Sequence, residues 1–298
     1  MTASAPNGVV VLDKPSGATS HQVVARLRRV LGTRKIGHAG TLDPMATGVL
    51  VLGVGRATRL LGHLALDDKR YLATVRLGER SHSDDADGRV EAVADASALT
   101  RALVGEACDA FRGDILQAPS AVSAIKVDGR RAHARVRAGE EVALPPRPVH
   151  VERLDILDAR VQGQCLDVDI DVECSSGTYV RAIARDLGEA LGVGGHLTAL
   201  RRTRVGAFTL DDAVVLGDEP PTLLAMGEAA RRSFPTLVLD EPSSRAVQVG
   251  RALELDLPAS PTGLLSPGGQ LLALYRPRDG RAVPVTVFVG PDDEIALG

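Results

Sequence analysis

Aromatic and sulfur-containing side chains are scarce in this chain of 298 residues, which has four Phe, three Tyr, three Cys and no Trp. Each tyrosine is therefore an individual candidate for a role in a site. The three cysteines, Cys108, Cys165 and Cys174, include no C-x-x-C pair. This spacing excludes a disulfide framework and a cysteine-based zinc site.

Long hydrophobic runs and targeting segments are also missing. The longest uncharged stretch, Leu257 to Tyr275, is interrupted by several prolines and glycines and cannot form a membrane helix. Met1 to Gly8 has neither the basic start nor the apolar core of a signal peptide. No G-x-G-x-x-G, GxxxxGK[ST] or H-E-x-x-H motif occurs, so we expect neither a nucleotide cofactor nor a metal. We expect a cytoplasmic protein that does not enter a membrane.

The charge balance does not by itself indicate a nucleic-acid binder, because 35 basic and 38 acidic residues give a net charge of −3. Positive charge is nevertheless clustered locally. These clusters fit three solvated faces as well as they fit one composite surface for phosphates. Their members are Arg26, Arg28, Arg29, Arg34 and Lys35; Arg130, Arg131, Arg135 and Arg137; and Arg201, Arg202 and Arg204.

Apolar residues recur with a period near 2 in some segments and near 3.6 in others, which predicts a mixed α+β protein. The clearest strand is Leu166 to Glu173, in which apolar residues alternate strictly with acidic ones. One face of this strand belongs to a core, and the other is wet or covered by cations. Phe234-Pro235 reads as a linker, and short strands between Pro/Gly turns follow it. We expect a domain over residues 1–234 and a small β domain over 235–298.

The segment Gly37 to Gly48 is the most unusual in the chain, with three glycines and Pro44 around Asp43. Pro44 forces Asp43 toward an extended backbone, and the glycines allow a tight loop. A carboxylate fixed in such a loop, just before a buried strand, is well placed to act as a nucleophile or base. The alternative is a turn in which Asp43 only accepts local backbone hydrogen bonds.

Two further polar segments flank predicted elements. Thr178 is predicted to cap a helix, which places Arg181 in its first turn, where a cation opposes the helix dipole. Either an anion compensates Arg181, or Arg181 is an exposed residue kept for solubility. Ser83 to Gly88 superficially resembles a calcium loop, but Ala94 stands where the bidentate Glu is required. We interpret this segment as a solvated turn.

Together these segments resemble the TruB family, the bacterial tRNA pseudouridine-55 synthases. The resemblance rests on the order and spacing of Gly8–Pro15, Gly37–Gly48, Tyr71, Gly177–Arg181 and Leu200–Gly206. It implies the pseudouridine synthase fold, a mixed, mainly antiparallel central sheet flanked by helices, followed by a C-terminal RNA-binding β domain of PUA type. It also implies that uridine 55 in the T-loop of tRNA is flipped out and isomerised to pseudouridine without metal or cofactor.

The resemblance also implies roles for individual residues. Asp43 is the nucleophile, and Arg181 pairs with it to keep it ionised and oriented. Tyr71 stacks on the flipped base and helps to remove the C5 proton. The remaining substrate-binding positions are His38, which fills the gap left by the flipped nucleotide, Leu200, which packs against the ring, and Tyr179 and Lys14.

One segment departs from the family pattern. Most members have Pro-Pro-x-Tyr-Ser-Ala-x-Lys where this chain has Pro119 to Lys126 without the second Pro and the Tyr. This departure falls in the RNA-gripping insertion at about 119–148, which we expect to be mobile in the free protein and ordered by RNA. The expected partner is the T-stem-loop of tRNA, bound by a monomer.

Three alternatives differ in class. One is a noncatalytic protein that binds or folds RNA, and another is a guide-directed synthase related to dyskerin, which the short C-terminal domain disfavours. The third is a carboxylate-based glycosidase, which would need a second acid near Asp43 that the surrounding segment does not supply.

Overall fold

The structure is a computed structural model that describes residues 6–123, 126–127, 130–131, 135, 140 and 144–297. Much of the predicted RNA-gripping insertion, including residues 132–134, 136–139 and 141–143, lies outside the described residues. Its expected mobility therefore stays a prediction. Within the insertion, β8 (Lys126–Val127) and β9 (Arg130–Arg131) pair with each other.

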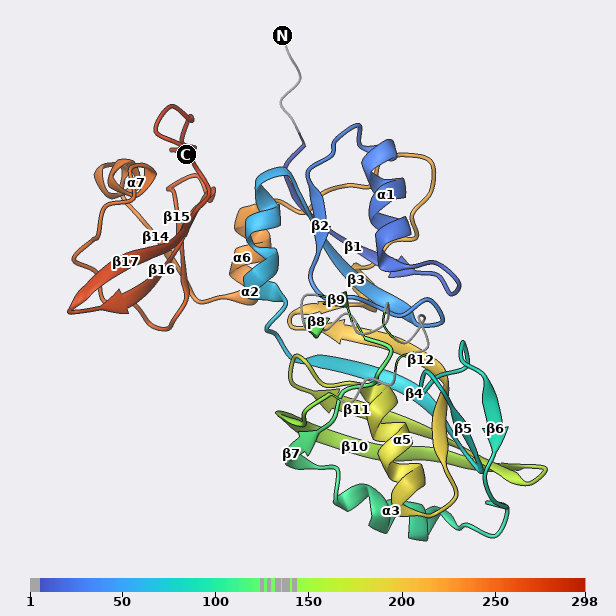
Figure 1. Ribbon diagram of the computed structural model, residues 1–298. Coiled ribbons are helices and arrows are strands. Elements are labelled where there is room, and N and C mark those ends of the chain that lie inside the picture. The colour runs from blue at the N-terminus through green and yellow to red at the C-terminus, as the bar shows by residue number, and fades with distance from the viewer. Residues whose placement is uncertain are drawn as a thin grey trace.

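A nine-stranded sheet forms the centre of the molecule (Figure 1). Its main path runs β1–β3–β12–β4–β11–β10–β7, with β2 added beside β3 and β13 beside β12. The β3–β12 pair is parallel and the other pairs of this sheet are antiparallel, which confirms the mixed, mainly antiparallel sheet. The strands are β1 (Gly8–Lys14), β2 (Ile36–His38), β3 (Thr47–Val54), β4 (Lys69–Leu77), β7 (Gly113–Gln117), β10 (Arg147–Gln162), β11 (Cys165–Cys174), β12 (Gly195–Val205) and β13 (Phe208–Thr209).

The predicted strand at Leu166 to Glu173 is the middle of β11, and its two faces differ as its alternation predicts. Leu166, Val168, Ile170 and Val172 are buried in the core. On the opposite face, Arg70 and Arg76 of the neighbouring strand β4 form paired hydrogen bonds with Asp171 and Asp167, at distances of 2.6–2.9 Å. Cations therefore cover the acidic face.

Helices cover the sheet where its apolar side chains lie. The helix α5 (Val180–Ala190) places Val180, Ile183, Ala184 and Leu187 in the main core, and Figure 1 shows it crossing the half of the sheet formed by β4, β11 and β10. Among the described residues before the C-terminal unit, the other helical elements are α1 (Ser20–Val30), the 3-10 turn η1 (Gly55–Arg59), α2 (Leu61–Leu64), α3 (Arg101–Asp109), the 3-10 turn η2 (Leu210–Asp212) and α6 (Met226–Ser233). No helix among the described residues has the length and apolar character needed to cross a membrane.

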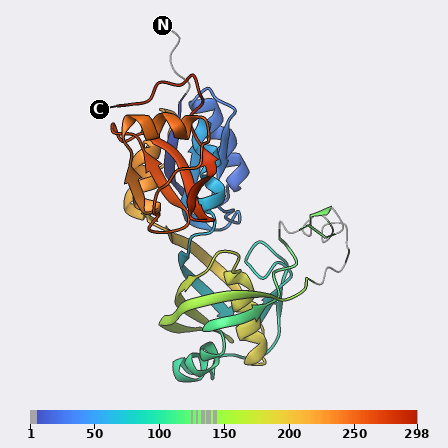
Figure 2. The same cartoon turned by 90° about the vertical axis from the view of Figure 1, so that its left-hand side faces the viewer.

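A small four-stranded sheet forms the C-terminal unit, which confirms the expected β-rich end of the chain. Figure 1 shows it beside α2 and α6, and Figure 2 shows it over the half of the molecule that contains β1 and β3. Phe288 and Leu265 join Val49 and Val51 in one apolar cluster, and Arg56 makes a paired contact with Asp293. The unit contains β14 (Thr236–Val238), α7 (Glu241–Gln248), β15 (Thr262–Leu265), β16 (Leu271–Arg278) and β17 (Arg281–Val287). The boundary at 234/235 and the PUA type stay predictions.

The short parallel pairing of β3 with β12 depends on Gly48. Its φ is +100°, and a Cβ atom there would lie 2.1 Å from the Arg202 carbonyl oxygen. We predict that Gly48→Ala lowers the free energy of unfolding by about 2 kcal/mol or more, measured by urea denaturation. Gly62→Ala is the control, because nothing lies within 4 Å of its added Cβ. A Gly48→Ala protein as stable as the wild type would show that the strands tolerate a wider separation.

Candidate active site

A cavity of about 280 Å³ lies where the loop before β3 meets β4, β12 and the first turn of α5. It brings together five of the residues singled out from the sequence, namely Asp43, Tyr71, Tyr179, Arg181 and Leu200. The other described residues of its wall are Gly40, Thr41, Leu42, Ala65, Lys69, Ser123, Arg147, Gly177, Thr178, Val180 and Arg202. His38 and Lys14 are not part of this wall.

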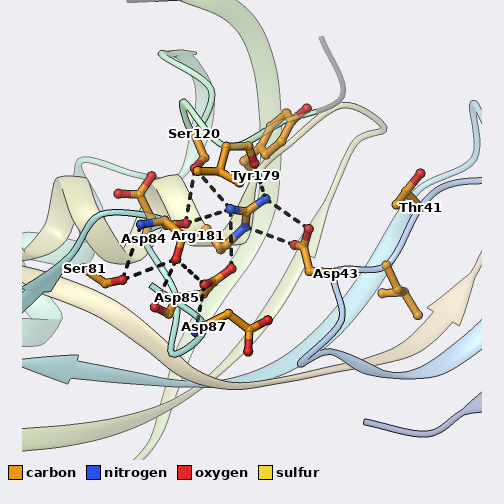
Figure 3. Close-up of polar contacts among 12 residues, drawn as sticks. Thr41, Asp43, Ser81, Asp84, Asp85, Asp87, Ser120, Tyr179 and Arg181 are labelled. Atoms are coloured by element: carbon orange, nitrogen blue, oxygen red, sulfur yellow. Dashed lines mark hydrogen bonds and ion pairs between the residues drawn. The ribbon is translucent and has the colours of Figure 1, made fainter. Parts of the chain in front are cut away.

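Asp43 and Arg181 form a side-on pair in this cavity (Figure 3). Arg181 Nη2 donates to Asp43 Oδ1 at 3.1 Å, and Arg181 Nε lies 3.0 Å from Oδ2. The Arg181 side chain is only 4% exposed, whereas the Asp43 side chain is 32% exposed. Two parallel contacts fix the plane of the carboxylate, which remains accessible from the cavity.

The Arg181 guanidinium also donates directly to acceptors other than Asp43 (Figure 3). Nη1 donates to the Ser83 carbonyl at 2.7 Å and to Ser120 Oγ at 3.2 Å, and Nη2 donates to the Val122 carbonyl at 2.9 Å. Asp85 Oδ2 lies 3.4 Å from Nη1. Arg181 is therefore a buried cation with a complete set of partners.

The interpretation of Ser83 to Gly88 as a solvated turn holds for Ala86 and Asp87, which are exposed, but is wrong for the first half of the segment. Ser83, Asp84 and Asp85 are buried, with Asp85 only 3% exposed. The segment folds against β12, where the Leu197 amide donates to the Asp84 carbonyl at 3.1 Å. Its two buried carboxylates face arginines, since Asp85 lies 3.4 Å from Arg181 and Asp84 lies 3.3 Å from Arg185. The cationic partners come from a distant helix, so the local sequence does not reveal them.

Burial raises the pKa of the Asp43 carboxyl above its ordinary value, and the nearby charge of Asp85 raises it further. The guanidinium of Arg181 opposes both effects. Because Arg181 also faces Asp85, its single charge is shared between two carboxylates. The ion pair thus orients the Asp43 carboxylate but leaves the pKa of Asp43 above that of an ordinary aspartate.

The start of α5 is set by a side chain outside the helix. The prediction that Thr178 caps this helix is wrong, because the helix begins at Val180 and the N-cap residue is Tyr179. The Gln117 amide accepts from the Tyr179 N–H at 2.8 Å and donates to the Tyr179 carbonyl at 3.1 Å. Gln117 is 2% exposed, so this bridge fixes the backbone two residues before Arg181.

Two buried cations hold the loop that carries Asp43. Lys14 Nζ donates to the carbonyls of Pro15, Ala18 and Pro44 at 2.6–3.2 Å. Arg202 donates to the carbonyls of Gly40, Thr41 and Val49 at 2.8–3.4 Å. Sequence reasoning missed this role of Arg202, because its position in a basic cluster gives no sign of burial.

The predicted substrate-binding role of Lys14 does not fit its position. Lys14 is 0% exposed, and burial lowers the pKa of its ammonium to about 8. Its three acceptors are all backbone carbonyls, so no donor is directed toward a ligand. Lys14 positions the loop that carries Asp43.

Tyr71 and Leu200 belong to the apolar part of the cavity wall and are both mostly buried. Burial raises the pKa of the Tyr71 phenol, and the neighbouring Arg202 charge opposes this shift. His38 packs edge-on against His21 with ring centroids 5.8 Å apart, and burial lowers the pKa of its imidazole. No three His, Cys, Asp or Glu side chains in the described part of the chain gather in a way that could hold a metal ion.

Comparison with known proteins identifies the family. Residues 28–180 match the N-terminal domain of the TruB family pseudouridylate synthases. Residues 181–218 match the C-terminal domain of tRNA pseudouridylate synthase B, and residues 234–289 match the C-terminal region of tRNA pseudouridine synthase II. The chain belongs to the TruB family of pseudouridine synthases.

Individual relatives of this TruB-family isomerase agree with that assignment. It is 56% identical to tRNA pseudouridine synthase B of Cutibacterium acnes, over 95% of this chain and 98% of the relative. It is 55% identical to tRNA pseudouridine synthase B of Rhodococcus jostii, over 94% of this chain and 93% of the relative. A chain in the crystal structure of a Cbf5–Nop10–Gar1 complex matches with a TM-score of 0.70 and 25% identity, over 96% of this chain and 86% of that one.

The position of Lys14 in this TruB-family chain generates a prediction. We predict that Lys14→Met lowers the free energy of unfolding by about 1–3 kcal/mol, because buried carbonyls lose their donor. The salt dependence of RNA binding should not change, since no phosphate contact is removed. If Lys14 binds a phosphate, the slope of log K against log salt will instead fall by about one.

Proposed function

We propose that this enzyme converts uridine 55 in the T-loop of tRNA to pseudouridine, with Asp43 as the nucleophile. The observation that carries the proposal is the side-on pair of Asp43 with the buried Arg181, open to a cavity walled by Tyr71 and Leu200. A base inside a folded loop must leave its stack to reach such a cavity. We further propose that the enzyme acts in the cytoplasm as a monomer.

The reaction is an isomerisation, so its atoms balance without a co-reactant. The C1′–N1 bond breaks, a C1′–C5 bond forms, the C5 proton leaves and N1 gains a proton. An aspartate carboxylate can assist by adding to the sugar or to the base and leaving again in a later step. Arg181 keeps the carboxylate oriented through both steps, because its own position is fixed by partners other than Asp43.

For Tyr71 the position supports stacking rather than proton removal. Burial raises the pKa of the phenol, which makes its ionised, proton-accepting form less available. The ring lies in the cavity wall together with Leu200. We propose that these two side chains sandwich the flipped uracil and so compensate for its lost stacking.

The alternatives are less well supported by the same geometry. A glycosidase needs two acids that both reach the substrate, but Asp43 is the only acidic side chain among the described residues of the wall. The second carboxylate, Asp85, is buried behind Arg181. A noncatalytic RNA-binding protein would have no need for an oriented carboxylate in a cavity where burial already disfavours its charge.

The nucleophile assignment predicts the effect of Asp43→Asn. Turnover should fall below about a hundredth of the wild-type rate, because an amide is a far poorer nucleophile. Affinity for tRNA should stay within a few-fold, because phosphate contacts supply most of it. Tritium release from tRNA labelled at C5 of uridine measures the turnover. The matched control is Asp95→Asn, a change at an exposed residue outside the cavity. Retained turnover in Asp43→Asn would refute the role of Asp43.

The shared charge of Arg181 predicts a pH effect. Because the pKa of Asp43 is raised, the single-turnover rate should begin to fall on acidification above the ordinary aspartate range near ~3.9. Asp85→Asn removes a negative charge that raises the pKa of Asp43. The acidic limb of the pH–rate profile of Asp85→Asn should therefore move to lower pH. This shift is expected even if the maximal rate of the variant also changes. A limb that stays in place or moves to higher pH would contradict the charge-sharing account.

A further inference from the structure

The wall of the active-site cavity carries more positive than negative charge. Among its described residues are four cations, Lys69, Arg147, Arg181 and Arg202, and one acid, Asp43. The uracil ring that the proposed function places there is neutral. The excess of positive charge therefore points to an anionic part of the substrate beside the base.

Three of these four cations are already committed to the protein. Arg181 is paired with Asp43 and Asp85, and Arg202 donates to three backbone carbonyls. Lys69 is 7% exposed and donates to the carbonyls of Ala65 and Asp67 at 3.0 and 2.6 Å. None of these three side chains is therefore available to form an ion pair with an anionic group of the substrate.

Arg147 is different. It is the first residue of β10, and it faces no carboxylate within ion-pair distance among the residues that the structure describes. One contact is a hydrogen bond from Nη2 to the Gly177 carbonyl at 2.7 Å. The other is with the Tyr179 ring, whose centroid lies 5.2 Å from Cζ. Arg147 Nε is shielded from solvent and has no hydrogen-bond partner in the described structure.

These two contacts hold Arg147 in place without neutralising it. A guanidinium stacked on an aromatic ring keeps its full charge and loses little conformational freedom when an anion binds. Tyr179 is fixed in turn by Gln117 and precedes Arg181 by two residues. A ligand bound to Arg147 is thus connected, through the short and fixed segment from Tyr179 to Arg181, to the residue that orients Asp43.

We propose that Arg147 binds a phosphodiester group that flanks the flipped uridine and thereby positions its ribose against Asp43. The proposal rests on the proposed function, because a neutral base leaves the RNA backbone as the anion within reach. Arg147 is a substrate-binding residue in this account, and Tyr179 is the platform that orients it.

The experiment is a double-mutant cycle between the arginine and the phosphate. Wild type and Arg147→Met are each titrated with a T-stem-loop RNA and with versions carrying a neutral methylphosphonate on the 5′ or the 3′ side of the target nucleotide. The target and the nucleotide that precedes it both lack the 2′-hydroxyl in all three RNAs, because the 2′-hydroxyl on the 5′ side of a methylphosphonate linkage would cleave it. Affinities are measured over a range of salt concentrations.

The proposal predicts that one methylphosphonate weakens binding to the wild type by about tenfold and leaves binding to Arg147→Met unchanged. The slope of log K against log salt should fall by about one in Arg147→Met. Arg147→Lys should recover only part of the affinity, because an ammonium keeps the charge but does not stack on Tyr179 as the planar guanidinium does. Equal losses in both proteins with both methylphosphonates would overturn the proposal and leave Arg147 a structural partner of Tyr179.

Two controls separate the possible failures. Arg101→Met removes an arginine that also donates to a backbone carbonyl, that of Ile156, but lies outside the cavity wall, so its cycle should show no coupling. Pseudouridine formation by the wild type on the all-ribose stem-loop is assayed in parallel. Absence of product there would refute the proposed function, whereas coupling in the binding cycle tests Arg147 alone.

Discussion

Arg181 brings a permanent positive charge into the protein interior, where an unpaired ion would cost several kcal/mol. The fold surrounds that charge with acceptors from two separate segments before Asp43 is counted: the Ser83 carbonyl and Asp85 come from one, and Ser120 comes from the other. Asp43 is therefore the last member of a set of acceptors that fixes the Arg181 guanidinium without it. This order of dependence explains how a carboxylate can be held in one orientation and still face an open cavity.

The strands place the remaining groups by simple alternation. Side chains two residues apart on a strand share a face, so Lys69 and Tyr71 on β4 reach the cavity together, as do Leu200 and Arg202 on β12. Arg201, between the last two, instead pairs with Asp13 at 2.7 Å. The basic run at Arg201 to Arg204 is thus divided between two faces and is not a single patch.

Much of this site could be predicted from the sequence, and the part that could not has a common physical cause. The loop around Asp43 and the strand Leu166–Glu173 show their structure through local glycines and through alternation. Asp85, Gln117 and Arg202 act through partners far along the chain, so their segments resemble ordinary polar surface until the tertiary contacts are known. The burial of Lys14 escaped sequence reasoning for a related reason, since the Pro44 carbonyl, 30 residues away in the sequence, is one of the three acceptors of its ammonium.

The central claim is that Arg181 acts by orienting Asp43 with a planar pair of donors, and the single-turnover rate of Arg181→Lys at saturating tRNA tests it most directly. Lysine keeps the positive charge but offers a single rotating ammonium. The account predicts a rate at least about tenfold lower, or about 1.4 kcal/mol, with tRNA affinity and salt dependence preserved. A near-wild-type rate combined with weaker, less salt-dependent binding would instead make Arg181 a phosphate contact and contradict the account.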